Sequence, residues 1–279
     1  MNNSFEKTVV VAMTCFNRAD KTVNCIESLV NGNPAIDFSF VVVDDNSSDD
    51  TVDRLKMLSK GINIHIIETQ GNLYYSRGMK KALDYILESN LKAEKDYLLL
   101  VNDDVDFYRN AIESLIQQSN EGIVVVGATC DSSGKQSYGA VKYLKKGALS
   151  TRKVCTGETI QADTFNANCV LIPIEAFICI GSFDEHYIHC LGDYDYGFKF
   201  SRSGYIIQSS KDYVGICDNN SIEGTWIDSS LGVVERLKLK ETPKGLPTKI
   251  WWYYVNKHFG IVAAIEHSIS PFIRIIFRK

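Results

Sequence analysis

A continuous apolar run that ends in a cluster of acids is the feature that most constrains this chain. The run is Tyr97–Val101, and Asp103, Asp104 and Asp106 follow it in the sequence YLLLVNDDVDF. Because apolar and polar residues do not alternate in the run, it predicts a strand buried on both faces, as in a parallel sheet covered by helices. Ligands of such sheets bind outside the carboxyl ends of the strands. The acids therefore occupy the expected position of a ligand site.

Carboxylates this close together repel one another unless a cation neutralises them, and their oxygen atoms suit Mg²⁺ or Mn²⁺. An ion held there would in turn hold a diphosphate. The alternative is a solvated loop in which Asp104 or Asp106 caps a helix that begins near Arg109. The run taken alone leaves both interpretations open.

Strands and helices alternate through the first 130 residues, which predicts a parallel sheet with right-handed crossovers. The expected strands are 8–13, 38–43, 62–67, 97–101 and 123–128, and the expected helices are 21–30 (capped by Asp20), 51–58, 73–87 and 109–118. The second strand ends in Asp44 and Asp45, as the fourth ends near Asp103 and Asp104. All four aspartates are therefore expected at one edge of the sheet.

The second half of the chain is less regular. Residues 132–159 are rich in Gly, Ser and Lys and predict a loop or hairpin, and a strand at 165–172 precedes a short helix that begins near Pro173. A helix from Asp193 to about residue 204 carries Asp193 and Asp195 in its first turn, and an ordinary capped helix is the alternative interpretation. The cluster Trp251–Tyr254 is expected in a core or an interface, and an apolar tail with basic residues spans 261–279.

Composition excludes several classes of protein. A net charge of −4 and a pI near 5.8 argue against nucleic acid as the main partner. The eight cysteines form no C-x-x-C pair, no signal peptide is apparent, and no apolar run reaches the ~18 residues of a membrane span. We therefore expect a cytoplasmic protein, soluble or peripheral to the inner face of the cell membrane. The glycine-rich phosphate loops of dinucleotide-binding proteins and P-loop proteins are missing.

Five motifs in order carry a resemblance: T-x-F-N-R after the first strand, D-D-N-S-S-D-D-T after the second, then G-N-L-Y-Y-S-R-G-M, N-D-D-V and G-D-Y-D-Y-G. In this order they resemble family 2 of the glycosyltransferases, and most closely its bacterial branch of rhamnosyl- and galactofuranosyl-like transferases of surface polysaccharides. The resemblance covers about residues 8–210 and extends faintly to 252. It implies an α/β GT-A fold, Rossmann-like, with a mostly parallel sheet flanked by helices. A GT-A domain at 1–215 and a helical, aromatic-rich C-terminal extension at 216–279 are expected.

The resemblance also implies roles for the residues that bind the nucleotide. Thr14, Asn17 and Arg18 match the turn that lies against the nucleobase and ribose of the donor. Asp45 matches the acid that accepts a hydrogen bond from the pyrimidine ring, and Arg77 is a candidate contact of the diphosphate.

The remaining roles concern the metal and the base. Asp104 matches the direct ligand of Mn²⁺ or Mg²⁺, and Asp103 either joins it or contacts the ribose or sugar. Asp193 matches the base that takes the proton of the attacking acceptor hydroxyl. At the start of a helix it is expected to have a depressed pKa.

This chain departs from the family where many members carry a His near the metal. The sequence there is GICDNNS, so that Cys217, Asp218 or Asn219 takes the place of the His. His186 and His189 precede the base and either reach the acceptor or the diphosphate or have a structural role.

The implied activity is transfer of a sugar, with inversion, from a UDP- or dTDP-linked donor to a saccharide acceptor, which we expect to be lipid-linked. A homo-oligomer is a further expectation. The alternatives are a catalytically inactive nucleotide-sugar-binding or scaffold protein, a sugar nucleotidyltransferase, and a glycoside hydrolase. The nucleotidyltransferase would carry a glycine-rich loop and an activating Lys after the first strand, and a hydrolase would have no use for Asp45.

Overall fold

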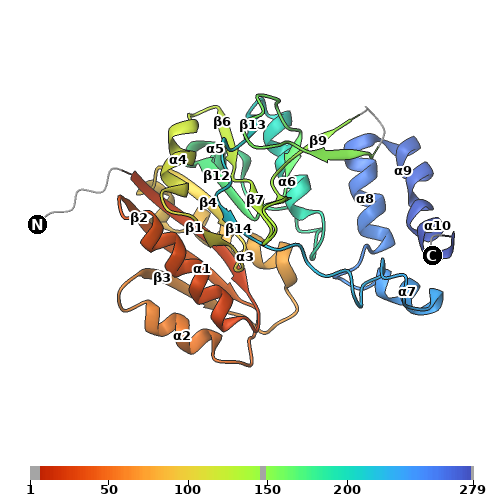
Figure 1. Cartoon of the computed structure of the whole chain (residues 1–279), viewed down its shortest axis with the longest axis horizontal. Helices are drawn as coiled ribbons and strands as arrows, with labels where there is room; N and C mark the ends of the chain where they lie inside the picture. Colours follow the sequence, from red (N-terminus) through yellow and green to blue (C-terminus); the bar gives the residue numbers. More distant parts are fainter. Residues whose placement is uncertain (1–6, 145–148, 278–279) are drawn as a thin grey trace, which may run out of the picture.

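The computed structural model describes residues 7–144 and 149–277, and its centre is a seven-stranded sheet with the order β13-β6-β12-β4-β1-β2-β3 (Figure 1). The strands of this sheet are β1 (Lys7–Cys15), β2 (Ile36–Asp44), β3 (Asn63–Glu68), β4 (Tyr97–Val101), β6 (Ile123–Val126), β12 (Cys169–Pro173) and β13 (Ile206–Ser209). The helices around it are α1 (Ala19–Gly32), α2 (Thr51–Leu58), α3 (Tyr74–Glu88), α4 (Ala111–Gln118), α5 (Ile174–Ile180) and α6 (Gly192–Arg202), with a short 3₁₀ helix, η1 (Asn90–Ala93).

The sheet is mostly parallel, as the alternation of strands and helices predicts. Strands β4, β1, β2 and β3 pair in parallel, and β13 pairs with β6 in parallel. Strand β12 lies between β4 and β6 and runs antiparallel to both. The expected five-strand series is therefore interrupted, because a strand from the second half of the chain separates β6 from β4.

Both faces of the sheet are covered, as the apolar runs predict. Along β1, Val10 and Ala12 face one core with the buried side chains of α3, α5 and α6, and Val9 and Val11 face a second core with those of α1, α2 and α4. Each large aliphatic side chain that is fully buried contributes roughly 1.5–3 kcal/mol. These two cores fix the edge at which β1, β2 and β4 end.

Two smaller sheets lie beyond this edge. One contains β5 (Asp106–Phe107), β7 (Thr129–Cys130), β8 (Gln136–Tyr138) and β14 (Gly215–Ile216), and the other contains β9 (Ala140–Tyr143), β10 (Thr151–Lys153) and β11 (Thr164–Phe165). Strands β9 and β10 pair in antiparallel fashion, which confirms the predicted hairpin, although residues 145–148 lie outside the described residues. The predicted domain boundary at 215/216 falls within β14 and stays a prediction.

Two predicted helix caps are wrong. Helix α4 begins at Ala111, and its first turn is capped by Asn33, whose Oδ1 accepts the N–H of Ile112 at 2.9 Å. Asp106 belongs to β5 instead, so the acids after β4 do not cap a helix. Helix α1 begins at Ala19, one residue before the expected cap, and Asp20 pairs with Arg54 of α2.

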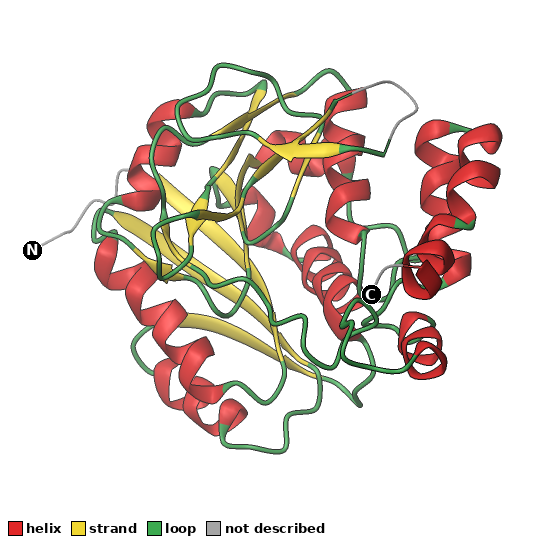
Figure 2. Cartoon of the chain, turned by 45° about the vertical axis from the view of Figure 1, so that its right-hand side comes forward, coloured by secondary structure: helices red, strands yellow, loops and turns green. Residues whose placement is uncertain are grey.

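The C-terminal region consists of four helices that lie together beside α6, at the end of the molecule away from the N-terminus (Figures 1 and 2). They are α7 (Val233–Lys240), α8 (Thr248–Phe259), α9 (Ile261–Ser268) and α10 (Ser270–Phe277). Tyr254 is fully buried in a third core, and its hydroxyl bonds that of Tyr143 at 2.8 Å. Trp251, Tyr253 and Tyr254 of the aromatic cluster therefore pack in this core, as expected, whereas Trp252 is exposed. Within the described part of the chain, the helices are too short or too polar to span a membrane.

Candidate active site

The acids that follow β4 are neutralised by an arginine from the loop after β1. Nη1 of Arg18 lies 3.0 Å from Oδ1 of Asp103 and 3.1 Å from Oδ2 of Asp104. Burial raises the pKa of Asp103 to about 6, with Arg18 opposing this rise and the charge of Asp104 adding to it. The pair is therefore a site for positive charge, and the guanidinium group satisfies part of that demand.

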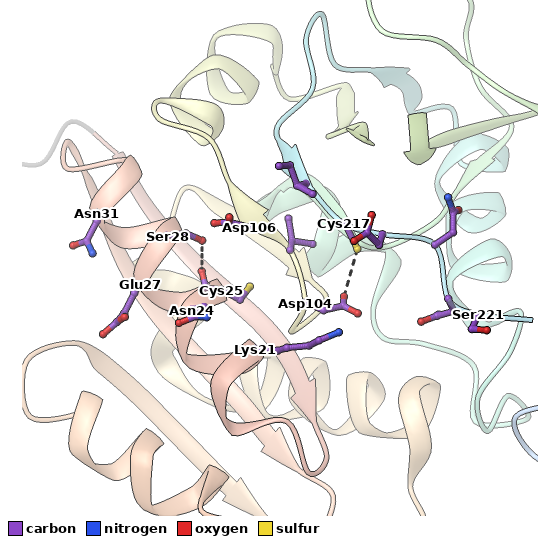
Figure 3. A pocket seen from close by; sticks show the side chains of 15 residues that line it. Lys21, Asn24, Cys25, Glu27, Ser28, Asn31, Asp104, Asp106, Cys217 and Ser221 are labelled. Atoms are coloured by element: carbon purple, nitrogen blue, oxygen red, sulfur yellow. Dashed lines mark hydrogen bonds between the residues drawn. The ribbon is translucent and has the colours of Figure 1, made fainter. Parts of the chain in front are cut away.

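A cysteine stands beside Asp104 where the family resemblance led us to expect a histidine. Sγ of Cys217 lies 3.5 Å from Oδ1 of Asp104, and burial together with that carboxylate raises the pKa of the thiol to about 12 (Figure 3). Asp218 instead accepts hydrogen bonds from the backbone and hydroxyl of Ser132, at 2.8 and 2.7 Å. Of the three candidates for the missing histidine, Cys217 is thus the one in contact with the acid pair.

An open pocket of about 620 Å³ reaches this corner of the site. Helix α1 forms one wall, and residues 216–221 form the other. Figure 3 shows Lys21 extending from α1 toward Asp104, whereas Asp106 points elsewhere. The Asp104 carboxylate is therefore accessible from this pocket.

The residues expected to bind the nucleotide lie in loops at the same edge of the sheet. Oδ1 of Asn17 accepts the N–H of Ser48 at 2.7 Å, which joins the loop after β1 to the loop after β2. Oγ1 of Thr14 donates to the carbonyl of Val43 at 3.1 Å. Asn17 has a left-handed backbone with φ of 51°, which asparagine tolerates better than most residues. Their roles toward a nucleotide stay predictions.

Asp45 is buried and shapes the start of α3. Its two carboxylate oxygens accept the backbone N–H groups of Leu73 and Tyr74, each at 2.9 Å. Arg77 is exposed on α3, and its backbone N–H bonds the carbonyl of Ile188 at 3.3 Å. The expected contact of Asp45 with the pyrimidine ring and that of Arg77 with the diphosphate stay predictions.

Asp193 lies in the first turn of α6 and is half-buried. Its Oδ1 accepts the N–H of Tyr194 at 2.9 Å, and its Oδ2 accepts the N–H of Ala167 at 3.3 Å. Burial nevertheless raises the pKa of Asp193 to about 6. The expectation of a depressed pKa is wrong, because the loss of water around the carboxylate outweighs the two N–H groups and the helix terminus.

The hydroxyl group of Tyr75 is affected by the charges of both Asp104 and Asp193. Its hydroxyl oxygen is buried and has no hydrogen-bond partner among the residues that the structure describes. Burial raises the pKa of Tyr75, and the charges of Asp193 and Asp104 add to that rise. Both carboxylates therefore lie within electrostatic range of one hydroxyl group. Sequence reasoning missed Tyr75, for which the Tyr-Tyr pair at the start of α3 was the available signal.

Close contact between α6 and α3 fixes the position of Asp193. A Cβ atom on Gly192 would lie 2.4 Å from Oγ of Ser76, so only glycine fits at this position. The same Oγ donates to the carbonyl of His189 at 2.7 Å, and burial lowers the pKa of His189 to about 4. His189 is therefore neutral at pH 7. His186 stacks on Tyr253, with ring centroids 4.3 Å apart.

The other acid of α6, Asp195, is fully buried and holds α8. Oδ1 of Asp195 lies 2.7 Å from Nζ of Lys257 and 2.8 Å from Nε2 of His258. Nζ of Lys257 also lies 2.7 Å from Oδ2 of Asp184. Although burial raises the pKa of both carboxylates, hydrogen bonds from Lys257 and from His258 or His186 lower them below their usual values. We call these four residues, Asp184, Asp195, Lys257 and His258, the α6–α8 clamp.

We expect Lys257→Ala to lower the Tm by about 5 °C, because it leaves the buried Asp195 and the half-buried Asp184 without their shared cation. Since the folded pKa values of Asp184 and Asp195 lie below the unfolded value of about 3.9, this stabilisation is complete above that pH and is lost as the pH falls below it. The difference between variant and wild type should therefore shrink below about pH 4. Thermal melts across pH, with the exposed Lys249→Ala as the control, measure this effect. If the two variants have the same Tm at pH 7, the ion pairs of the clamp do not contribute to the stability of the fold.

The acid pair suits a hard divalent cation. Among residues 7–144 and 149–277, no three His, Cys, Asp or Glu side chains are grouped as a complete set of metal ligands. Mg²⁺ and ions like it bind through one or two carboxylates and complete their coordination with water and substrate phosphates. Asp103 and Asp104 provide such a donor set, and the buried charge of Asp103 is only partly compensated by Arg18.

Comparison with known proteins agrees with this geometry. A family model described as glycosyl transferase family 2 matches residues 10–180. A comparison with curated proteins gave no match. Among solved structures, the mannosyltransferase PcManGT from Pyrobaculum calidifontis, in complex with GDP-Man and Mn²⁺, is similar with a TM-score of 0.60 and 12% identity, over 98% of this chain and 74% of that one. TarS 1-349 from S. aureus in complex with UDP-GlcNAc is similar with a TM-score of 0.55 and 16% identity, over 97% and 81%.

The sheet, its flanking helices and the acids at its carboxyl edge define a protein with the GT-A fold, as these neighbours have. The family model covers more than half of the chain. The chain belongs to glycosyltransferase family 2, which confirms the family inferred from the five motifs.

Proposed function

We propose that this protein is an inverting, metal-dependent glycosyltransferase that moves a sugar from a UDP- or dTDP-linked donor to a saccharide acceptor. The observation that carries the proposal is that Asp104 and Asp193, from different elements, both lie within electrostatic range of the hydroxyl of Tyr75. One acid belongs to the cation site at the end of β4, and the other begins α6. Transfer with inversion needs both groups: a cation site for the leaving diphosphate and a general base for the acceptor hydroxyl.

Asp104, with Asp103, would hold Mn²⁺ or Mg²⁺, as the Mn²⁺ in the similar mannosyltransferase supports. When bound, such an ion neutralises the charge of the departing nucleoside diphosphate. Arg18 keeps the two carboxylates side by side through one nitrogen atom, and its positive charge favours the diphosphate at the same place. Donors with a diphosphate are supported by the GDP-Man and UDP-GlcNAc of the two neighbours.

Asp193 would take the proton of the acceptor hydroxyl. A base works best when its pKa lies near the operating pH, and the pKa of Asp193, about 6, is closer to neutral than that of an exposed aspartate. The N–H groups of Ala167 and Tyr194 hold the carboxylate in place. Because Gly192 packs against Ser76, the base stays at a fixed position relative to α3.

The acceptor we propose is a lipid-linked saccharide in the synthesis of a surface polysaccharide, used at the cytoplasmic face of the membrane. The family resemblance and the apolar surface of α9 and α10 support this proposal. The aromatic cluster at Trp251–Tyr254 gives it little support, because all of its members except Trp252 pack in the core of the C-terminal region. A homo-oligomer stays a prediction.

A donor panel tests this function. Thermal shifts with dTDP-rhamnose, UDP-galactofuranose and other nucleotide sugars, with and without Mn²⁺, should give a metal-dependent rise in Tm for one nucleotide class. Incubation of that donor with a saccharide acceptor should release the nucleoside diphosphate. Release of pyrophosphate would instead indicate a nucleotidyltransferase, and binding without turnover would indicate a nucleotide-sugar-binding protein.

A further inference from the structure

The last two helices expose aliphatic side chains at a regular spacing. Val262, Ile265, Ile269, Ile273 and Ile276 follow one another at intervals of three or four residues from α9 through Ile269 into α10. Each of them is at least half exposed, from 50% for Ile276 to 66% for Val262. We call these five residues the aliphatic strip. Residues at such intervals lie on one side of a helix, so Val262 and Ile265 share an exposed side of α9, and Ile273 and Ile276 share an exposed side of α10.

The opposite sides of the same helices are already packed. Ala263 and Ala264 of α9 and Ile275 of α10 are buried. Nε1 of Trp251 donates to the carbonyl of His267 at 3.0 Å, which fastens α9 to α8. The strip is thus the second apolar side of helices whose first apolar side already forms the core. Contiguous exposed apolar surface of this kind marks an interaction site.

The C-terminal region, which carries this surface, is basic, whereas the rest of the chain is acidic. Residues 233–279 contain nine Lys and Arg against three Asp and Glu, a net charge of +6, whereas residues 1–232 contain 21 against 31, a net charge of −10. Four of the basic side chains in the described part of the C-terminal region are exposed, namely Lys238, Lys244, Lys249 and Arg274. An acidic domain therefore carries a basic helical region with an aliphatic surface.

We propose that α9 and α10 dock onto an anionic lipid bilayer, with the aliphatic strip entering the boundary between headgroups and acyl chains. Helices that lie in this boundary combine an apolar side with basic residues, and both contribute to binding. The charge asymmetry favours a negatively charged bilayer over an apolar protein partner, because the region that carries the strip has a net charge of +6 and the rest of the chain has a net charge of −10. The proposal does not depend on the sugar donor or on catalysis.

Vesicle sedimentation of the full chain tests the docking. The wild type should sediment with phosphatidylcholine vesicles that contain phosphatidylglycerol, bind much less to pure phosphatidylcholine, and dissociate as salt is raised. The double variant Ile265→Ser/Ile273→Ser should lower the partition coefficient at least about tenfold. Met57→Ser is the matched control, because it removes an apolar side chain of similar exposure, 68%, from α2. Circular dichroism should show all three proteins equally folded.

Three results would overturn the docking surface. They are a wild type that stays in solution with anionic vesicles, a double variant that binds as well as the control, and a wild-type dimer that the double variant turns into a monomer. The last result would make the strip an interface between copies of this chain. Sedimentation velocity on the same samples distinguishes it.

A second inference rests on the unpartnered hydroxyl of Tyr75. A buried hydroxyl without a hydrogen bond costs stability, so its presence calls for a partner that arrives later. Burial and the neighbouring carboxylates keep it protonated, which makes it a donor. The charges of Asp104, the proposed metal ligand, and of Asp193, the proposed base, both act on this hydroxyl. We infer that Tyr75 donates a hydrogen bond to an oxygen of the transferred sugar, an inference that depends on the proposed function.

Tyr75→Phe separates this role from a structural one. The variant should have an unchanged or higher Tm, bind the free nucleotides UDP and dTDP as the wild type does, and bind the nucleotide sugar about three- to tenfold more weakly. Tyr196→Phe is the contrasting control, because the Tyr196 hydroxyl already donates to the carbonyl of Gly181 at 2.7 Å. It should lower the Tm and leave sugar binding unchanged.

The measurements use UDP-galactofuranose and dTDP-rhamnose in titrations against UDP and dTDP alone. If the wild type binds these nucleotide sugars and Tyr75→Phe binds them equally well, the inference about Tyr75 fails while the proposed function stands. If the wild type binds neither the nucleotides nor their sugars, both fail together.

Discussion

Asp193→Asn should abolish sugar transfer and leave donor binding intact. The amide has nearly the same shape and keeps one oxygen, which can accept the N–H of either Tyr194 or Ala167, but it cannot take the acceptor proton. Loss of a general base typically lowers the rate by about 10²–10⁴-fold. In the wild type, the rate should rise with pH through about 6 and level off above it, because only the ionised carboxylate acts as a base.

The same variant has a second, opposite signature in stability. The pKa of Asp193 is about 6 in the folded chain and about 3.9 in an unfolded one. Folding is therefore penalised as the pH rises through this interval, and the penalty is complete above pH 6. Asp193→Asn removes it, so the Tm above pH 6 should stay equal or rise by a few degrees.

The exposed Asp53→Asn serves as the control for a change of charge alone, and it should match the wild type in rate and Tm. Near-normal turnover of Asp193→Asn would end the assignment of the base. A lower rate with a large fall in Tm would make Asp193 a structural residue of α6 instead.

Asp104→Asn should weaken Mn²⁺ binding roughly 10²-fold, because one of two carboxylates is replaced by a neutral amide. Electron paramagnetic resonance of free Mn²⁺ measures this loss without any substrate. The metal-dependent rise in Tm with the donor should disappear as well. The fold should persist, since Arg18 keeps its ion pair with Asp103 at 3.0 Å.

Asp106→Asn is the matched control within the same acid cluster. Asp106 is exposed in β5 and points away from Asp104 (Figure 3), so its amide should leave Mn²⁺ and donor binding unchanged. If both variants lose Mn²⁺ binding equally, the loss comes from the overall charge of the pocket and not from a direct contact of Asp104 with the ion. Unchanged Mn²⁺ binding in Asp104→Asn would contradict the metal site.

The sequence predicted the framework of the fold and the acids at its edge, because both depend on local patterns. A strand buried on both faces is a run of apolar residues, and the carboxyl ends of parallel strands meet at one edge, so Asp103 and Asp104 were readable from their position after β4. The position and antiparallel direction of β12 could not be predicted, because its place between β4 and β6 follows from pairing with residues far away in the chain.

The electrostatics of the site were less predictable for the same reason. The helix start at Asp193 is a local feature, whereas the burial that raises its pKa comes from surrounding elements. The contact of Cys217 with Asp104 joins residues 113 positions apart. The hydroxyl of Tyr75 acquires its meaning only when α3, α6 and the end of β4 are brought together.

The α6–α8 clamp fixes the C-terminal helices relative to the proposed base. Lys257 and His258 bind the acid that lies two residues from Asp193, so the C-terminal helices and the proposed base keep a constant separation. An enzyme resting on a bilayer through α9 and α10 would hold its reaction centre at a set height above the lipid. It would then select among growing chains by the distance of their ends from the surface, and act as a ruler as well as a catalyst.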